Sequence, residues 1–173
     1  MNLNNKKVLI AYFSREGNNY VNGSIVNLPL GNTQVAAEMI EEHTGGDLFR
    51  IEANYLYPSD YTKCTEVAKD ELRNNIRPEL TESVDIEDYD VIFLGYPNWW
   101  GTAPMPVFTF LEQYGFDGKI IVPFCTHEGS GMGHSEKDIK EICPGAEVKK
   151  GLAIHGGSVM KSKNVIVNWV EKE

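Results

Sequence analysis

Two adjacent tryptophans, Trp99 and Trp100, stand in the segment Gly95-Tyr96-Pro97-Asn98-Trp99-Trp100-Gly101-Thr102-Ala103-Pro104, directly after an apolar run. Neighbouring residues of a regular element cannot both point inward, so at least one indole should lie at the surface or over a ligand. Indole faces suit a flat ligand with an apolar face and a polar rim. Core packing explains either tryptophan alone about equally well, but the pair within this restricted loop favours a ligand.

A second group of side chains is suited to holding a phosphate. Ser14 and Thr33 supply hydroxyl groups, Asn32 supplies an amide, and Arg15 adds a charge beside Glu16. Thr33 opens a predicted helix, whose first N–H groups attract anions. The alternative is that Asn32 and Thr33 only cap this helix. Neither G-x-G-x-x-G nor G-x-x-x-x-G-K-[ST] is present, so glycine spacing does not decide between the two.

A third loop, residues 126–133, is rich in glycine. Its glycines allow close approach of backbone N–H groups to a ligand, and its candidate ligand-binding residues are Thr126, His127, Glu128, Gly129 and Gly131. His127 and His134 lack further metal ligands at suitable spacing, so no metal site is predicted.

Five apolar runs alternate with segments of helical period, and this alternation predicts an α/β fold. Strands are expected at residues 8–13, 47–52, 91–94, 119–125 and 147–154, and helices at residues 33–44, 61–75, 105–114, 135–143 and 162–170. Strands alternating with helices predict a doubly wound five-stranded parallel sheet with helices on both faces. Such sheets bind ligands beyond the carboxyl ends of their strands, which is where all three loops fall.

Composition restricts the classes of partner. The 173 residues carry a formal net charge of −9, which disfavours nucleic acid and suits docking on a basic patch of another protein. Three widely spaced cysteines indicate reduced thiols in a cytoplasmic protein, and no run is apolar and long enough to span a membrane. A single domain over residues 1–173 is expected, because no linker or repeat divides the chain.

The three loops together resemble those of the flavodoxin family. The resemblance is carried by Ser14 with Gly31-Asn32-Thr33, by the segment 95–104, and by Pro123-Phe124-Cys125-Thr126-His127-Glu128-Gly129-Ser130-Gly131, and it covers essentially the entire chain. It is greatest for the subgroup with an enlarged phosphate loop and a Tyr-Pro-x-Trp-Trp-Gly flavin loop. It implies a flavodoxin-like sheet of order 2-1-3-4-5 and FMN as the cofactor.

The resemblance also implies roles for individual residues. Ser14, Arg15, Asn32 and Thr33 would hold the phosphate, and Thr126, His127, Glu128, Gly129 and Gly131 would face the pyrimidine end of the ring. Pro97, Asn98 and Gly101 would bond the polar edge of the ring, while Trp99 or Trp100 stacks on it, with Trp99 preferred. An alternative alignment takes residues 14–19 as the phosphate loop. The alignment through Gly31-Asn32-Thr33 is preferred because these residues open the helix, and it leaves residues 16–30 as an insertion that forms either a flap over the ribityl chain or a surface excursion.

The function implied is electron transfer through FMN, with a redox protein as partner. Acidic residues at 85, 87, 88 and 90 are expected to disfavour a reduced, anionic flavin and to aid docking. The alternatives are an FMN-dependent NAD(P)H oxidoreductase acting on a flavin or quinone, and a binding module that has lost its flavin. No side chain is assigned as a catalytic acid, base or nucleophile, because the cofactor carries the redox chemistry.

Overall fold

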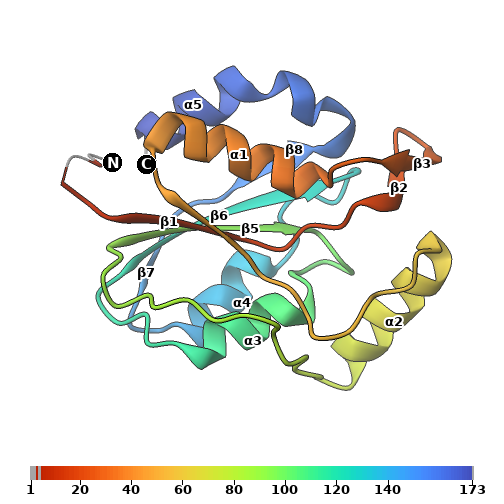
Figure 1. The fold of residues 1–173 in the computed structure, drawn as a ribbon, viewed down its shortest axis with the longest axis horizontal. Helices are drawn as coiled ribbons and strands as arrows, with labels where there is room; N and C mark the ends of the chain where they lie inside the picture. Colours follow the sequence, from red (N-terminus) through yellow and green to blue (C-terminus); the bar gives the residue numbers. More distant parts are fainter. Residues whose placement is uncertain (1–2, 4, 173) are drawn as a thin grey trace.

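A parallel β-sheet forms the centre of the computed structural model, which describes residue 3 and residues 5–172 (Figure 1). Its strands are β1 (Val8–Tyr12), β4 (Asp47–Arg50), β5 (Val91–Pro97), β6 (Ile120–His127), β7 (Glu147–Val148) and β8 (Leu152–His155). They pair in the order β4-β1-β5-β6-β7, and β8 also pairs with β6; every pairing is parallel. When the strands are numbered as the five predicted ones, with β7 and β8 together as the fifth, this order is 2-1-3-4-5. The predicted fold class is therefore confirmed.

The predicted strand at residues 147–154 is divided into β7 and β8, and Pro123 of β6 explains the division. The carbonyl groups of Lys119 and Ile121 accept hydrogen bonds from the β7 side at 2.9 Å each. Residues alternate along a strand, so Pro123 faces the same side as these two, and it has no N–H to donate. β6 therefore pairs with β7 before Pro123 and with β8 after it.

Helices cover both faces of the sheet, as expected. In Figure 1, α1 (Asn32–Thr44) and α5 (Lys163–Lys172) lie on one face, and α3 (Met105–Gln113) and α4 (Ser135–Ile142) lie on the other. The alternation of β1 assigns its side chains to the two cores. Ile10 packs in the core that includes Ile40 and Ile166, whereas Leu9 packs in the core that includes Phe110 and Ile139.

Two elements lie beyond the carboxyl ends of the strands instead of on a sheet face. They are α2 (Tyr61–Arg73) and a hairpin formed by β2 (Gly17–Val21) and β3 (Ser24–Leu28) (Figure 1). The hairpin turns at Asn22 and Gly23, with φ values of 50° and 87°. Positive φ at both central residues is the requirement of a type I′ turn, for which Asn-Gly is a preferred pair.

Two further observations complete the fold. A 3₁₀ helix, η1 (Gly156–Lys161), connects β8 to α5. Among the described residues, no helix combines the length and the apolar character that crossing a membrane would need.

Candidate functional site

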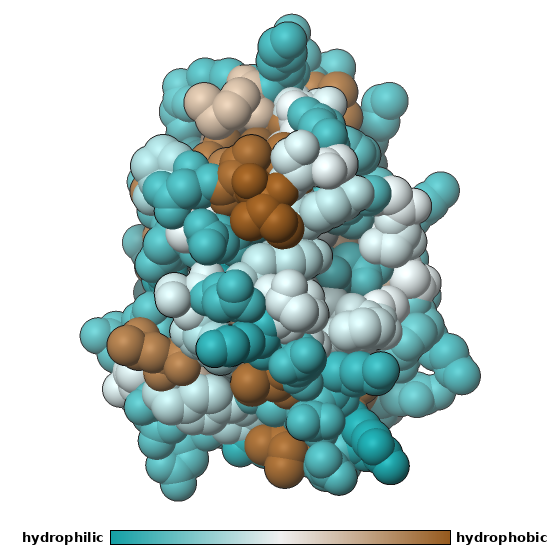
Figure 2. Space-filling view, turned by 90° about the vertical axis from the view of Figure 1, so that its right-hand side faces the viewer, coloured by the Kyte–Doolittle hydropathy of each residue, from teal (hydrophilic) through white to brown (hydrophobic). Residues whose placement is uncertain are grey.

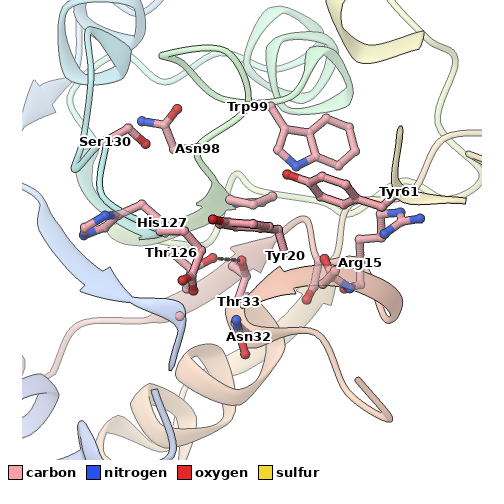
Figure 3. Close-up of a pocket in the computed structure, with 15 residues that line it drawn as sticks. Arg15, Tyr20, Asn32, Thr33, Tyr61, Asn98, Trp99, Thr126, His127 and Ser130 are labelled. Atoms are coloured by element: carbon pink, nitrogen blue, oxygen red, sulfur yellow. Dashed lines mark hydrogen bonds between the residues drawn. The ribbon is translucent and has the colours of Figure 1, made fainter. Parts of the chain in front are cut away.

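A pocket of about 300 Å³ lies at the carboxyl ends of β1, β5 and β6, where the sequence predicted a ligand (Figure 3). It is lined by Ser14, Arg15, Asn19, Tyr20, Asn32, Thr33, Tyr61, Pro97, Asn98, Trp99, Thr126, His127, Glu128, Ser130 and Gly156. All three predicted loops therefore contribute to one cavity. Among the predicted residues, those that do not line it are Trp100, Gly101, Gly129 and Gly131.

The first turn of α1 is open to the pocket. Its N-cap is Gly31, which has no side chain to cap the helix, and Ser14 Oγ instead accepts from the backbone N–H of Gln34 at 3.0 Å. A Cβ on Gly31 would lie 2.2 Å from Ser14 Oγ, so the glycine is needed for this close approach. No acidic residue stands in the first turn. The backbone N–H groups of Asn32 and Thr33 thus form a site suited to an anion.

Two buried hydroxyl groups lie on the floor of the same corner. Thr33 Oγ1 and Thr126 Oγ1 are 2.8 Å apart, and the residues are only 1% and 4% exposed. One hydroxyl hydrogen serves the bond between them, so the other is left to donate elsewhere. Among the described residues it has no recorded acceptor, and a ligand oxygen in the pocket would supply one. The residues present therefore fit the phosphate and polar chain of a bound nucleotide.

Arg15 lines the pocket, but its guanidinium group is engaged with the protein backbone. It donates to the carbonyl oxygens of Pro58 and Ser59, each at 2.9 Å, and to that of Asn18. These contacts join the base of the hairpin to the segment that precedes α2. The predicted phosphate-binding role of Arg15 stays a prediction, and the structure assigns the side chain a second, structural role.

The tryptophan loop is a tight turn that separates its two indoles. Trp99 and Thr102 exchange backbone hydrogen bonds of 2.9 and 3.3 Å. Between them, Trp100 and Gly101 have φ values of 55° and 88°, again the pattern of a type I′ turn. Positive φ is unusual for a bulky residue such as tryptophan, so the turn is locally strained.

Trp99 faces the pocket, whereas Trp100 faces α2. The ring of Trp99 packs edge-on against Phe13 and Tyr57, with centroids 5.2 Å apart in both pairs. Trp100 is 50% exposed, which confirms that at least one of the two indoles lies at the surface. Its Nε1 donates to the carbonyl of Thr65 at 2.9 Å. Trp99 is consequently the tryptophan placed to contact a ligand.

Asn98 ties the tryptophan loop to the loop after β6. Its Nδ2 donates to the carbonyl of Gly131 at 2.8 Å, and its Oδ1 accepts from the N–H of Gly101 at 2.9 Å. Gly101 and Gly131 lie outside the pocket but fix the orientation of Asn98 within it. One amide hydrogen of Asn98 remains for a ligand.

His127 and Glu128 make contacts that the sequence did not predict. His127 Nδ1 accepts from the N–H of Gly129 at 2.9 Å, so Gly129 supports the wall without lining it. Burial lowers the pKa of His127, and the neighbouring His155 lowers it further. Glu128 accepts from backbone N–H groups of the hairpin and of η1.

Sequence reasoning did not propose Tyr61, Ser130 or Gly156 as site residues, and it included Asn19 only in the alternative phosphate loop and Tyr20 only in the insertion 16–30. Tyr20 comes from β2 and Tyr61 from α2, and their rings stack with centroids 6.2 Å apart at an interplanar angle of 28°. In Figure 3, Tyr20 reaches across the pocket between Trp99 and the two threonines. The Asn-Gly pair at the hairpin turn is the sequence signal that could have revealed this wall.

The face that carries the pocket also exposes apolar side chains. Figure 2 shows this end of the molecule, with apolar groups among mostly polar ones. Tyr20, Ile25 and Leu30, all from the segment that contains the hairpin, are between 42% and 50% exposed.

The acidic segment lies at the opposite end of the sheet from the pocket, which argues against a direct effect on a bound flavin. Asp90 Oδ2 accepts from the backbone N–H of Lys7 at 2.8 Å, and Asp88 pairs with the ammonium group of Lys7 at 3.3 Å. These residues precede β1 and β5, so they lie at the amino ends of the strands, opposite the pocket. Within the described part of the chain, no cluster of three or more His, Cys, Asp or Glu side chains could hold a metal ion.

Comparison with known proteins identifies the family. A family model described as Flavodoxin matches residues 7–173. A protein of Bacteroides eggerthii DSM 20697, provisionally described as a flavoprotein, is 32% identical, with a TM-score of 0.72 over 94% of this chain and 98% of that one. A search of curated proteins gives no match.

Two more distant structures share the fold. The flavoprotein of Lactobacillus acidophilus NCFM, solved in complex with FMN, is 24% identical, with a TM-score of 0.66 over 92% of this chain and 99% of that one. Oxidised Flavodoxin 2 of Bacillus cereus is 21% identical, with a TM-score of 0.52 over 96% and 99% of the two chains. The family model covers nearly the whole sequence, and the sheet has the order that the resemblance implied. The chain therefore belongs to the flavodoxin family.

Proposed function

We propose that this protein binds FMN and transfers electrons through it. One observation carries the proposal: a single pocket combines a helix N-terminus whose N-cap is a glycine and a spare buried hydroxyl hydrogen at one end with an indole wall at the other. An anion and a flat aromatic ring are the two ends of FMN. The Lactobacillus relative bound to FMN supports the choice of cofactor.

Each wall of the pocket has a role in this proposal. The N–H groups of Asn32 and Thr33 hold the phosphate, and the Thr33–Thr126 hydroxyl pair donates its spare hydrogen to it. Trp99 stacks on the ring, and Asn98 presents an amide hydrogen to the polar edge of the ring. The bound flavin supplies the redox chemistry, and the protein tunes it through stacking, hydrogen bonding and local charge.

A redox protein with a basic docking patch is the partner that we propose. The net charge of −9 favours encounter with such a surface, and the apolar side chains beside the pocket offer a contact area at the flavin end. The acidic segment 85–90 is excluded from this docking face because it lies at the opposite end of the sheet.

A second function is favoured by a second cavity. About 390 Å³ of space, lined by residues that include Cys64, Thr65, Ala68 and Trp100, adjoins the first pocket and shares Trp99 and other residues with it. Small side chains on α2 leave this slot open beside the proposed ring position. It would admit a second planar reactant, as an NAD(P)H-dependent oxidoreductase acting on a flavin or quinone requires.

The visible absorption spectrum after incubation with FMN tests the cofactor proposal. We expect bound flavin and a measurable affinity for FMN by calorimetry, with riboflavin binding more weakly because it lacks the phosphate. If FMN does not bind, the remaining alternative is a binding module that has lost its flavin. Steady-state turnover of NAD(P)H with a quinone, without an added protein, would reject the pure carrier in favour of the oxidoreductase.

A further inference from the structure

A single glutamate holds the tip of the β2–β3 hairpin against the body of the protein. The backbone N–H of Asn22 donates to Glu128 Oε2 at 2.9 Å, and that of Gly157 donates to Glu128 Oε1 at 3.1 Å. Glu128 belongs to the loop after β6, and its side chain is only 18% exposed. One carboxylate thus joins the hairpin tip to η1, and His155 Nε2 lies 3.6 Å from Oε2.

The tip also fits against two glycines. A Cβ on Gly157 would lie 2.1 Å from Asn22 Oδ1, and a Cβ on Gly156 would lie 2.5 Å from Glu128 Oε1. Neither glycine has a positive φ, so the backbone conformation alone would permit a side chain at both positions. The space that these glycines leave is occupied by the hairpin tip and by the glutamate that holds it.

The rest of the hairpin is sparsely attached. Among the described residues, the Asn22–Glu128 bond is the sole recorded hydrogen bond between residues 20–30 and the chain outside the hairpin. At the base, Arg15 donates to the carbonyl of Asn18, and the side chain of Asn19 donates to the carbonyl of Arg15 at 3.0 Å. The hairpin is therefore held at its base, by the stacking of Tyr20 on Tyr61 and by one carboxylate at its tip.

This arrangement matters because the hairpin is a wall of the pocket. Asn19 and Tyr20 of β2 line one side of the cavity, and Glu128 and Gly156 line another. The Asn22–Glu128 bond closes the space between these two walls. If the bond breaks, β2 can move away while its base stays fixed by Arg15.

We propose that Glu128 is a positioning residue that latches the hairpin over the bound ligand and thereby sets the rate at which the ligand leaves. The proposal rests on the proposed function in that the ligand is FMN. Glu128 acts through the backbone of Asn22 and Gly157. A carboxylate suits this role because each of its oxygens accepts one N–H group, and hydrogen bonds to a charged acceptor are stronger than neutral ones.

The first test measures FMN dissociation by stopped flow. Glu128→Ala should release FMN about 10- to 100-fold faster, the factor expected from losing a hydrogen bond to a charged group. Glu136→Ala is the matched control, because Glu136 Oε1 accepts from the N–H of Gly151 at 2.7 Å outside the pocket. Its dissociation rate should equal that of the wild type. An unchanged rate in Glu128→Ala would overturn the proposal.

A steric variant tests the latch with Glu128 left in place. Gly157→Ala puts a methyl group where the Asn22 amide lies, so it should lift the tip and accelerate FMN release. Asn22→Gly keeps the backbone N–H, tolerates the positive φ and removes the obstructing amide. The double variant should return to within about twofold of the wild-type rate, since the two changes compensate at one contact. A double variant as fast as Gly157→Ala would contradict the latch.

A flavin-free measurement separates this inference from the proposed function. Hydrogen exchange of the Asn22 amide in the protein without FMN should be faster in Glu128→Ala and unchanged in Glu136→Ala. If the wild type fails to bind FMN, the proposed function falls while this exchange result still tests the latch. If FMN binds but neither the exchange nor the dissociation rate changes, the function stands and the latch falls.

Discussion

The hydroxyl oxygens of Thr33 and Thr126 lie 2.8 Å apart and join the first turn of α1 to the end of β6. This bond connects the first turn of α1, which we propose to bind the phosphate, to the end of β6, which leads into the loop proposed to contact the flavin ring. The pair leaves one hydrogen to donate.

Removing either hydroxyl should weaken FMN binding more than riboflavin binding. Thr33→Val keeps the shape of the side chain and should lower the affinity for FMN about 10- to 100-fold, the value of one hydrogen bond to a charged group. Thr109→Val is the control, because its hydroxyl bonds within α3, at 3.4 Å from the carbonyl of Met105. Calorimetry with FMN and riboflavin measures both ratios. Equal losses for the two ligands would refute a role in phosphate binding.

The two tryptophans should differ in their effect on the flavin. Trp99→Phe should lower FMN affinity by about tenfold or less, because an aromatic ring remains, and Trp99→Ala should lower it further. Trp100→Ala should leave the affinity near that of the wild type, since this indole contacts α2. Quenching of protein fluorescence during FMN titration measures the affinities. A larger effect at Trp100 than at Trp99 would show that the ring lies elsewhere.

Gly101→Ala should destabilise the protein by about 1–2 kcal/mol. Gly101 has a φ of 88°, and a Cβ there would lie 3.3 Å from His134 Nε2. Gly115→Ala is matched to it, because no atom lies within 4 Å of the added Cβ and its φ is not positive. Urea unfolding of the flavin-free proteins gives the free energies. Similar values for both variants would argue against strain in the tryptophan turn.

Stability should fall as the pH rises from about 10 toward 12. Burial, followed by the hydrogen bond to Glu71, raises the pKa of Tyr55 from 10.0 to about 12, and burial beside Glu71 also raises the pKa of Tyr57. Above pH 10 the unfolded chain therefore loses protons that the folded protein keeps, so the free energy of unfolding decreases. Tyr57→Phe should reduce this pH dependence. Urea unfolding from pH 8 to 11 would reveal it, and identical slopes in the variant and the wild type would disprove this origin.

The sheet could be predicted from sequence because its central strands are covered on both faces. Such strands are nearly continuous apolar runs, and the run from Val8 to Phe13 is unmistakable. The division of the last strand could not be predicted, because it depends on which neighbouring strand Pro123 faces. That neighbour is known only once the pairing register of β6 is fixed. The position of the acidic segment could have been derived, since residues before a parallel strand lie at its amino end.

The site was predictable in its location but not in its internal bonds. The three loops follow strands, so topology alone brought them together. The contacts of Arg15 and Asn98 with backbone carbonyl groups depend on partners 43 and 33 residues away. No local pattern encodes such partners. A flap was only one of two alternatives left open for residues 16–30, although Asn22-Gly23 is a strong turn signal for the hairpin.

The break in strand pairing at Pro123 also determines the edge of the sheet beside β6. The edge of the sheet beside β6 consists of two short strands, β7 with two residues and β8 with four, instead of one long strand. The unpaired N–H and C=O groups of a long, straight edge strand can pair with strands of other chains, whereas short offset strands are a poor template for such pairing. A proline that divides the ladder therefore also makes this edge of the sheet a poor template for aggregation.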